Sequence, residues 1–161
     1  MPRSDTMIRL TEILSESTIH LNIPVGDKPS VIRDLADVLA RAGVVTDTDR
    51  VVEDILSRER VMSTGIGGGI AVPHAQSAGA KRLALALGRM AVPVDFEALD
   101  ERPVNLVFLV VGPDEKGGFI RVLARIGRLL YSGDLQRNLL RARTPTEVME
   151  CIRYEESRIT G

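Results

Sequence analysis

The sequence is poor in several residue types, and each shortage excludes a class of protein. It has 1 Cys, so neither an internal disulfide nor a zinc site built on several thiolates can form. It has no Trp and 3% aromatic residues, which argues against stacking platforms for single-stranded nucleic acid and against a carbohydrate-stacking groove. The chain has 21 basic and 22 acidic residues, and the resulting net charge of -1 favours neither nucleic acid nor anionic lipid as a partner.

Long apolar segments are also missing. The amino-terminal residues MPRSDTMIRL contain no apolar core of the length that a signal peptide needs. The longest apolar stretch, Leu106 to Val111, is far shorter than the roughly 18 residues of a membrane span. We therefore expect a cytoplasmic protein that does not insert into membranes.

The remaining composition is that of an ordinary globular domain, with 44% hydrophobic and 27% charged residues. No repeat, proline-rich linker or low-complexity tract divides the chain, so residues 1–161 are expected to form one domain. The hydrophobic pattern predicts strands at 18–23, 70–72, 82–90 and 104–111, and helices at 30–42, 47–60, 118–130, 134–140 and from Pro145 onward. Such alternation predicts a three-layer α/β domain, with a mixed central β-sheet and helices on both faces.

One segment concentrates residues that suit chemistry. Residues 63–75 read STGIGGGIAVPHA and place four glycines in five positions. Glycines let another group come close to the backbone, and clustered N–H groups can bind an anion. Because Pro73 ends the short strand, we expect His74 to emerge beside the glycine turn.

His74 is a candidate for covalent chemistry, because imidazole is nucleophilic near neutral pH and can carry a covalent group. The alternative is a structural histidine beside an ordinary glycine turn. Nucleotide-binding motifs do not fit, since position 70 is Ile where GxGxxG requires glycine, and no GxxxxGK[ST] follows.

The pattern from Glu59 through Ile66-Gly67 to IAVPHA, with His74 in its last block, resembles the signature of a known family. This is the type-2 (fructose/mannitol) IIA domain of the phosphoenolpyruvate:sugar phosphotransferase system (PTS). The resemblance covers about residues 14–153, and the STGIG variant is most similar to the nitrogen-regulatory branch, IIA-Ntr (PtsN). It implies a phosphohistidine carrier without cofactor or metal, rather than an enzyme that turns over a free small molecule.

The resemblance also implies roles for particular residues. His74 would take a phosphoryl group, on the imidazole nitrogen away from the backbone, from an HPr-like phosphocarrier (NPr) charged by enzyme I and phosphoenolpyruvate. Arg58, which matches the family's arginine, would stabilise the charge of that group. Phosphoryl transfer depends mainly on positioning and charge. Further neutral donors would be Thr64 and the backbone amides of Gly67, Gly68 and Gly69.

One position departs from the family. Many relatives carry a second active-site histidine at the start of the helix after the long buried strand, and an ungapped placement puts Phe119 there. Arg121 is a candidate substitute or docking residue. Phosphoryl acceptance is still expected, whereas onward transfer becomes an open question. The other histidine, His20, lies in the first predicted strand, and we expect it to be structural.

Other polar features have plainer interpretations. The acidic loop residues are expected to be solvated surface rather than metal ligands: Asp95, Glu97, Asp100 and Glu101. Three arginines at helical spacing form either a solvated face or a docking surface for an acidic partner: Arg121, Arg125 and Arg128. Cys151 is expected to pack on the last helix.

Together these observations predict a regulator of the nitrogen phosphotransferase system whose phosphorylation state changes what it binds. Phosphorylation of His74 would add about two negative charges at one place. Targets in the branch that it resembles include potassium transporters and sensor kinases. Two alternatives stay open: a sugar-specific IIA component that passes phosphate to a IIB domain, and a binding module on the same scaffold that is not phosphorylated.

Overall fold

The computed structural model describes residues 8–113 and 117–160, and its helices and strands alternate along the chain. Two 3-10 turns come first, η2 (Leu10–Glu12) and η3 (Glu16–Thr18). The strands are β1 (Ile19–Ile23), β2 (Gly65–Gly67), β3 (Ile70–Ala71), β4 (His74–Gln76), β5 (Ala84–Val94) and β6 (Val104–Gly112). The helices are α1 (Lys28–Arg41), α2 (Thr48–Val61), α3 (Gly118–Leu130), α4 (Asp134–Arg141) and α5 (Pro145–Thr160).

The strands form one mixed sheet in the order β1-β5-β6-β3-β2, and β4 also pairs with β6. The long central strands β5 and β6 are antiparallel. Strand β1 runs parallel to β5, while β3 and β4 run parallel to β6. Strand β2 turns back against β3 as an antiparallel hairpin. Both β3 and β4 therefore lie along β6, one after the other in the same direction.

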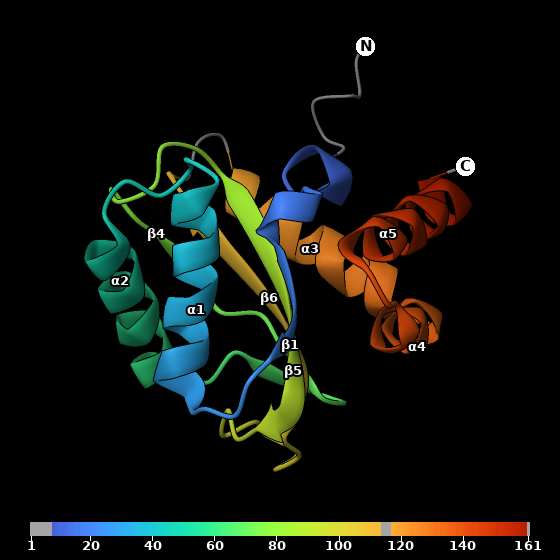
Figure 1. Ribbon diagram of the computed structural model, residues 1–161, viewed down its shortest axis with the longest axis horizontal. Coiled ribbons are helices and arrows are strands. Elements are labelled where there is room, and N and C mark those ends of the chain that lie inside the picture. The colour runs from blue at the N-terminus through green and yellow to red at the C-terminus, as the bar shows by residue number, and fades with distance from the viewer. Residues whose placement is uncertain (1–7, 114–116, 161) are drawn as a thin grey trace.

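Helices cover both faces of this sheet, with α1 and α2 on one side and α3, α4 and α5 on the other (Figure 1). The buried side chains divide into two apolar clusters in the same way. Strand β6 contributes alternately to both: Val107, Leu109 and Val111 to the cluster under α1 and α2, and Leu106, Phe108 and Val110 to the other. This alternation explains why the sequence of β6 is apolar almost throughout. The predicted three-layer α/β fold is confirmed.

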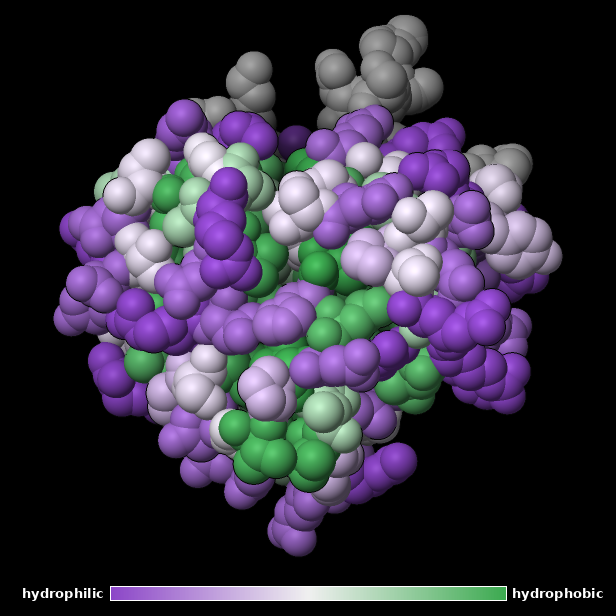
Figure 2. Space-filling view, viewed as in Figure 1, coloured by the Kyte–Doolittle hydropathy of each residue, from purple (hydrophilic) through white to green (hydrophobic). Residues whose placement is uncertain are grey.

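The outer surface is mostly hydrophilic in the orientation of Figure 1, and apolar side chains gather near its lower edge (Figure 2). Within the two described ranges, no helix combines the length and the apolarity that are needed to cross a bilayer.

Helix α1 begins earlier than the sequence pattern predicts. The predicted helix begins at residue 30, but the N-cap is Asp27, whose carboxylate accepts a hydrogen bond from the Ser30 N–H at 3.0 Å. The Ser30 hydroxyl in turn accepts from the Asp27 N–H at 2.9 Å, which completes a capping box. The hydrogen bonds from Ser30 lower the pKa of Asp27. Helix α2 begins as predicted, because Asp47 accepts from the Arg50 N–H.

Strand β5 runs to Val94, past the predicted end at residue 90. Its pairing with β6 shifts register between Arg89 and Val94, and this irregularity accommodates Pro93, which has no N–H to donate. The extension places the loop after β5 next to the start of α1 and the end of α2.

Candidate functional site

His74 opens strand β4 and pairs with Val110, near the carboxyl end of β6. The two residues before it, Val72 and Pro73, connect β3 to β4. Pro73 has no N–H and holds the preceding residue in an extended conformation. In open α/β sheets, ligands bind beyond the carboxyl ends of the parallel strands, which is the edge where the half-buried His74 side chain lies.

One nitrogen of the His74 ring is engaged by the backbone. Its Nδ1 lies 2.7 Å from the carbonyl oxygen of Val72. Because a carbonyl oxygen only accepts hydrogen bonds, Nδ1 carries the hydrogen. In the neutral imidazole the lone pair is then on Nε2, the nitrogen away from the backbone.

Arg58 lies in the last turn of α2, where its Nη1 donates a hydrogen bond to the carbonyl oxygen of Met62 at 2.9 Å. The chain then runs from Met62 to Thr64, whose carbonyl oxygen accepts from the Val72 N–H at 2.9 Å. Helix α2 also packs against β4. The structure therefore places the segments that carry Arg58, Thr64 and His74 side by side.

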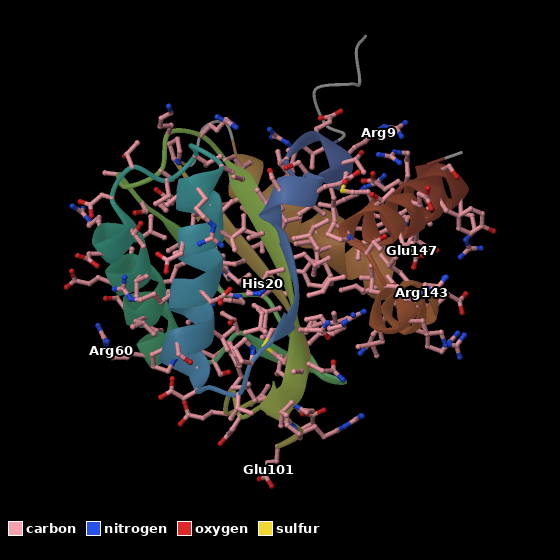
Figure 3. The ribbon with its side chains drawn as sticks, in the orientation of Figure 1. Arg9, His20, Arg60, Glu101, Arg143 and Glu147 are labelled. Atoms are coloured by element: carbon pink, nitrogen blue, oxygen red, sulfur yellow. The ribbon has the colours of Figure 1, made fainter. Side chains whose placement is uncertain are left out.

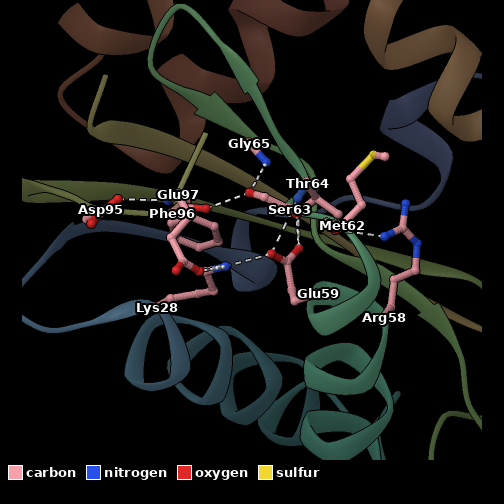
Figure 4. A network of polar contacts seen from close by, with 10 residues as sticks. All are labelled: Lys28, Arg58, Glu59, Met62, Ser63, Thr64, Gly65, Asp95, Phe96 and Glu97. Carbon is pink, nitrogen blue, oxygen red and sulfur yellow. Dashed lines mark hydrogen bonds and ion pairs between the residues drawn. The ribbon is translucent and has the colours of Figure 1, made fainter. Parts of the chain in front are cut away.

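Thr64 is buried, and both of its donors are directed at the carboxylate of Glu59 (Figure 4). Its backbone nitrogen lies 3.2 Å from Oε2, and its hydroxyl donates a hydrogen bond to the same oxygen. Thr64, which the sequence analysis names as a donor to the phosphoryl group, thus directs both its N–H and its hydroxyl at Glu59 within the protein.

The glycine turn lies away from His74, which corrects the expectation that the two are adjacent. Gly67, Gly68 and Gly69 all have positive φ, of 94°, 67° and 89°. The Gly69 carbonyl accepts from the N–H groups of Asn105 and Leu106, at the start of β6. His74 pairs five residues further along β6, which corresponds to about 16 Å of extended strand.

The polar groups of the glycine turn serve other contacts. The Gly68 N–H donates to the Asp100 carboxylate at 2.9 Å and, together with the Arg102 N–H, lowers the pKa of Asp100. The Gly68 carbonyl accepts from the Gln136 side chain on α4 at 2.6 Å. The structure does not bring Gly67, Gly68 and Gly69 together with His74.

Phe119 and Arg121 lie in the first turns of α3, which follows the carboxyl end of β6. Phe119 is 6% exposed and belongs to the same apolar cluster as Val72 and Val110. The position that the resemblance assigns to a second histidine is thus a core position here. The half-buried Arg121 folds back over the start of its own helix, near Gly117.

The remaining sequence candidates are engaged in structural contacts. His20 bonds Asp34 of α1 through Nδ1 at 2.6 Å and lies between β1 and α1 (Figure 3), in line with the structural role expected for it. The arginine row on α3 is not a uniform free face, because the Nε of Arg125 lies 3.4 Å from the buried carboxylate of Glu156.

The acidic loop is likewise occupied by local contacts. Asp95 accepts from the N–H of Glu97, and Glu97 pairs with Lys28. Among the residues that the structure describes, no three His, Cys, Asp or Glu side chains are grouped to hold a metal ion. Cys151 is partly buried, and burial together with Glu147 and Glu150 raises its pKa.

A polar network around Glu59 has no counterpart in the sequence predictions (Figure 4). Lys28 Nζ lies 3.0 Å from Glu59 Oε1 and 3.1 Å from Glu97 Oε1. Burial by itself would lower the pKa of Lys28, but the hydrogen bonds and attraction from the two carboxylates raise it overall. The only sequence signal for this network is that Glu59 occupies a fixed position of the IIA signature.

The network lies beside a cavity of about 550 Å³ between the start of α1, the end of α2 and the loop after β5. Charged side chains on its wall include Lys28, Glu59, Arg60, Asp95 and Glu97. Lys28 and Glu59, which are paired with each other, therefore both line this cavity.

Comparison with known proteins defines the class of this fold and site. The structure matches the crystal structure of nitrogen regulatory protein IIA-Ntr from Neisseria meningitidis with a TM-score of 0.81 and 31% identity, over 88% of this chain and 97% of that one. The family described as phosphoenolpyruvate-dependent sugar phosphotransferase system, EIIA 2, matches residues 12–155. The chain belongs to this EIIA 2 family.

Two branches of the family are represented among its relatives. A nitrogen regulatory protein of Pseudomonas aeruginosa is 33% identical over 147 residues, which cover 91% of this chain and 96% of the relative. The fructose-specific EIIABC component of Bacillus subtilis is 36% identical over 150 residues, or 92% of this chain but only 24% of that longer protein. These matches confirm the resemblance to type-2 IIA domains and to their nitrogen-regulatory members.

Proposed function

We propose that the protein is a regulator of the nitrogen phosphotransferase system and accepts a phosphoryl group on Nε2 of His74. The donor is an HPr-like phosphocarrier (NPr), charged by enzyme I and phosphoenolpyruvate. The main support is the 2.7 Å hydrogen bond from Nδ1 of His74 to the Val72 carbonyl, because it leaves the Nε2 lone pair to attack phosphorus. The proposal places the protein in the cytoplasm with that donor system.

The transfer balances without any further reactant. The Nε2 lone pair of His74 forms a bond to phosphorus while the bond from phosphorus to the donor's imidazole nitrogen breaks, and the donor ring keeps that electron pair. Arg58 is the proposed charge partner of the phosphoryl group. Only one of the guanidinium's N–H donors is directed at Met62, so others remain for phosphoryl oxygens.

Intact-mass measurement tests this proposal directly. With enzyme I, phosphocarrier and phosphoenolpyruvate, the wild-type protein should gain one phosphoryl group that is labile in acid and stable in base. His74→Ala should gain none. His20→Ala is the matched control and should gain the group as wild type does, because His20 is bonded to Asp34. Phosphorylation of His74→Ala would refute the site assignment.

We further propose that phosphorylation switches binding partners, such as potassium transporters or sensor kinases. About two negative charges added at one place change the local potential of a protein whose net charge is -1. Partners that present acidic groups to His74 should then lose affinity, and partners that present arginines should gain it. Pull-downs with wild type, His74→Ala and His74→Asp should yield different sets of proteins. Identical sets at matched salt would refute the switch.

A sugar-specific IIA role is the second candidate, favoured by the similarity to the fructose-specific EIIABC component. It requires onward transfer of the phosphoryl group to a IIB domain. Incubation of the phosphorylated protein with a fructose-type IIB domain separates the two roles, because only the sugar-specific role moves the group to IIB. A third candidate, a binding module without phosphorylation, is favoured by Phe119 at the second histidine position. Such a module would bind its target equally as wild type and as His74→Ala.

A further inference from the structure

We infer that Glu59 is a positioning residue for His74, acting through Thr64 and Val72. The tautomer that it maintains is a property of the unphosphorylated protein. Its effect on phosphoryl transfer rests on the function proposed above. The chain of contacts runs from Lys28 to Glu59, Thr64, Val72 and His74.

Glu59 is held in one orientation from two sides. Its carboxylate is 6% exposed and accepts hydrogen bonds from three donors: Lys28 Nζ, the Thr64 N–H and the Thr64 hydroxyl. A buried carboxylate needs such partners, because an uncompensated buried charge is strongly unfavourable. Thr64 is therefore fixed in both its backbone and its side chain.

Thr64 in turn fixes Val72. The Val72 N–H donates to the Thr64 carbonyl at 2.9 Å, just beyond the last residue of β3. Pro73 follows and restricts Val72 to an extended conformation. With its N–H held by Thr64 and its ψ limited by Pro73, Val72 directs its carbonyl oxygen at Nδ1 of His74.

The direction of this carbonyl decides which ring nitrogen is nucleophilic. The hydrogen bond made by one imidazole nitrogen determines the tautomer and thus the state of the other. If the Val72 carbonyl turns away, the ring hydrogen redistributes between Nδ1 and Nε2. A ring with its hydrogen on Nε2 has no lone pair there to attack phosphorus.

A purely structural role for Glu59 is the alternative. In that case, loss of its charge lowers thermal stability but leaves the tautomer of His74 unchanged. Stability alone therefore does not separate the two roles, whereas the tautomer does.

Long-range 1H–15N NMR spectra of the unphosphorylated protein report the tautomer. Wild type should show His74 with its hydrogen on Nδ1. Glu59→Gln should show a mixture of tautomers. The carboxylate has two oxygens that accept from the three donors, whereas the amide has only one oxygen. The matched control is Asp100→Asn, which makes the same change at the glycine turn and should leave His74 as in wild type. Folded Glu59→Gln protein with the wild-type tautomer would overturn the inference.

Thr64 provides a second test if Glu59→Gln does not fold. Thr64→Val removes one donor to Glu59 and should give a smaller shift in the tautomer population than Glu59→Gln. Thr64→Ser keeps the hydroxyl and should restore the wild-type population. The inference is overturned if Thr64→Val and Thr64→Ser have the same tautomer population.

The kinetic test separates positioning from donor binding. Glu59→Gln should lower kcat for phosphorylation of His74 by about tenfold. The KM for the phosphocarrier should stay unchanged, because the 6% exposed Glu59 offers little surface for a partner protein to contact. An unchanged kcat in folded Glu59→Gln protein also counts against the inference. If wild type itself takes no phosphate, the proposed function fails, and the NMR result still decides whether Glu59 positions His74.

Discussion

The chemistry that we propose for the site depends on a single ring nitrogen. Val72 holds Nδ1 of His74 through its carbonyl, and this contact selects Nε2 as the nitrogen with a lone pair. We propose that two further residues act on that atom from neighbouring segments, Arg58 through its charge and Glu59 through Thr64. Each residue therefore has a distinct expected effect: His74 on acceptance, Arg58 on rate and Glu59 on tautomer.

Arg58 should affect the rate of transfer without affecting the fold. Two unit charges 4 Å apart attract each other by about 4 kcal/mol at an effective dielectric constant of 20. Because only the part of this attraction that increases in the transition state affects the rate, Arg58→Ala should slow phosphorylation of His74 by about a hundredfold, measured by mass spectrometry against time. Arg58→Lys should recover part of the rate, since it keeps the charge and loses the fork of donors.

The control for this variant is Arg60→Ala. Arg60 is an exposed arginine of the same helix turn, and its guanidinium bonds Ser57. The Arg60→Ala variant should be phosphorylated on His74 at the wild-type rate. A wild-type rate for Arg58→Ala with a slowed Arg60→Ala would assign the charge partner to Arg60 instead.

At the scale of elements, β6 organises the site by carrying β3 and β4 in succession. The glycine turn precedes β3, and His74 opens β4, so the two lie at different positions along the same strand. The glycine turn and His74 are close in sequence but separated in space, because the residues between them are extended. The β2–β3 turn is therefore a structural feature of this sheet edge.

Gly68→Ala tests this separation. The left-handed φ of Gly68, 67°, is unfavourable for alanine, so the free energy of unfolding should fall by about 1 kcal/mol in urea titrations. The rate of His74 phosphorylation should stay at the wild-type value, because the turn is remote from the ring. A rate loss much larger than the stability change would show that the turn contributes to the site.

Helix α5 packs into the apolar core through Val148, Met149 and Ile152, and its buried carboxylate Glu156 adds polar contacts to the first described residues and to α3. Glu156 is 1% exposed and accepts from the Leu10 N–H, the Thr11 hydroxyl and Arg125. Glu156→Ala leaves these donors without that acceptor and should lower the free energy of unfolding by about 3 kcal/mol. Glu150→Ala, an exposed acidic residue of the same helix, should change it little. Equal effects of the two variants would contradict this role.

Sequence patterns predict elements well where local chemistry decides them. The apolar run of β6 is one example. The starts of α2 and α5 are others, because the Asp47 carboxylate accepts from the Arg50 N–H and the Thr144 hydroxyl accepts from the Glu147 N–H. The patterns fail where the pairing between strands determines the structure. The continuation of β5 past Pro93 depends on an irregular register with β6, and the place of the glycine turn depends on where β3 and β4 pair.

In the whole molecule, two layers of helices enclose the mixed sheet (Figure 1). His74 lies at the end of the sheet where β6 has its carboxyl end. This architecture follows from the alternation of strand and helix patterns along the chain. The contact from Glu59 to Thr64 could not be predicted in the same way, because no periodicity marks a residue whose partner is a carboxylate five positions away. Only the family signature singles Glu59 out.

Two carboxylates should contribute to stability in acid, Asp27 at the start of α1 and Asp100 beside the glycine turn. Hydrogen bonds lower the pKa of Asp27 and of Asp100 below the ordinary value of 3.8. Their stabilising contribution is fully present above that ordinary value and is lost as pH falls through the lowered folded-state values. The variant with both Asp27→Asn and Asp100→Asn should therefore show a shallower loss of stability below about pH 4 in thermal melts. An acid limb as steep as that of wild type would contradict this assignment.

The most direct test of the account is the position of phosphorus on the protein after incubation with the complete donor system. Long-range 1H–15N and 31P NMR spectra of the phosphorylated protein distinguish the two ring nitrogens and the two histidines. We expect one phosphoryl group, on Nε2 of His74, because Nδ1 donates its hydrogen to the Val72 carbonyl. A phosphoryl group on Nδ1, on His20 or on no histidine would contradict it.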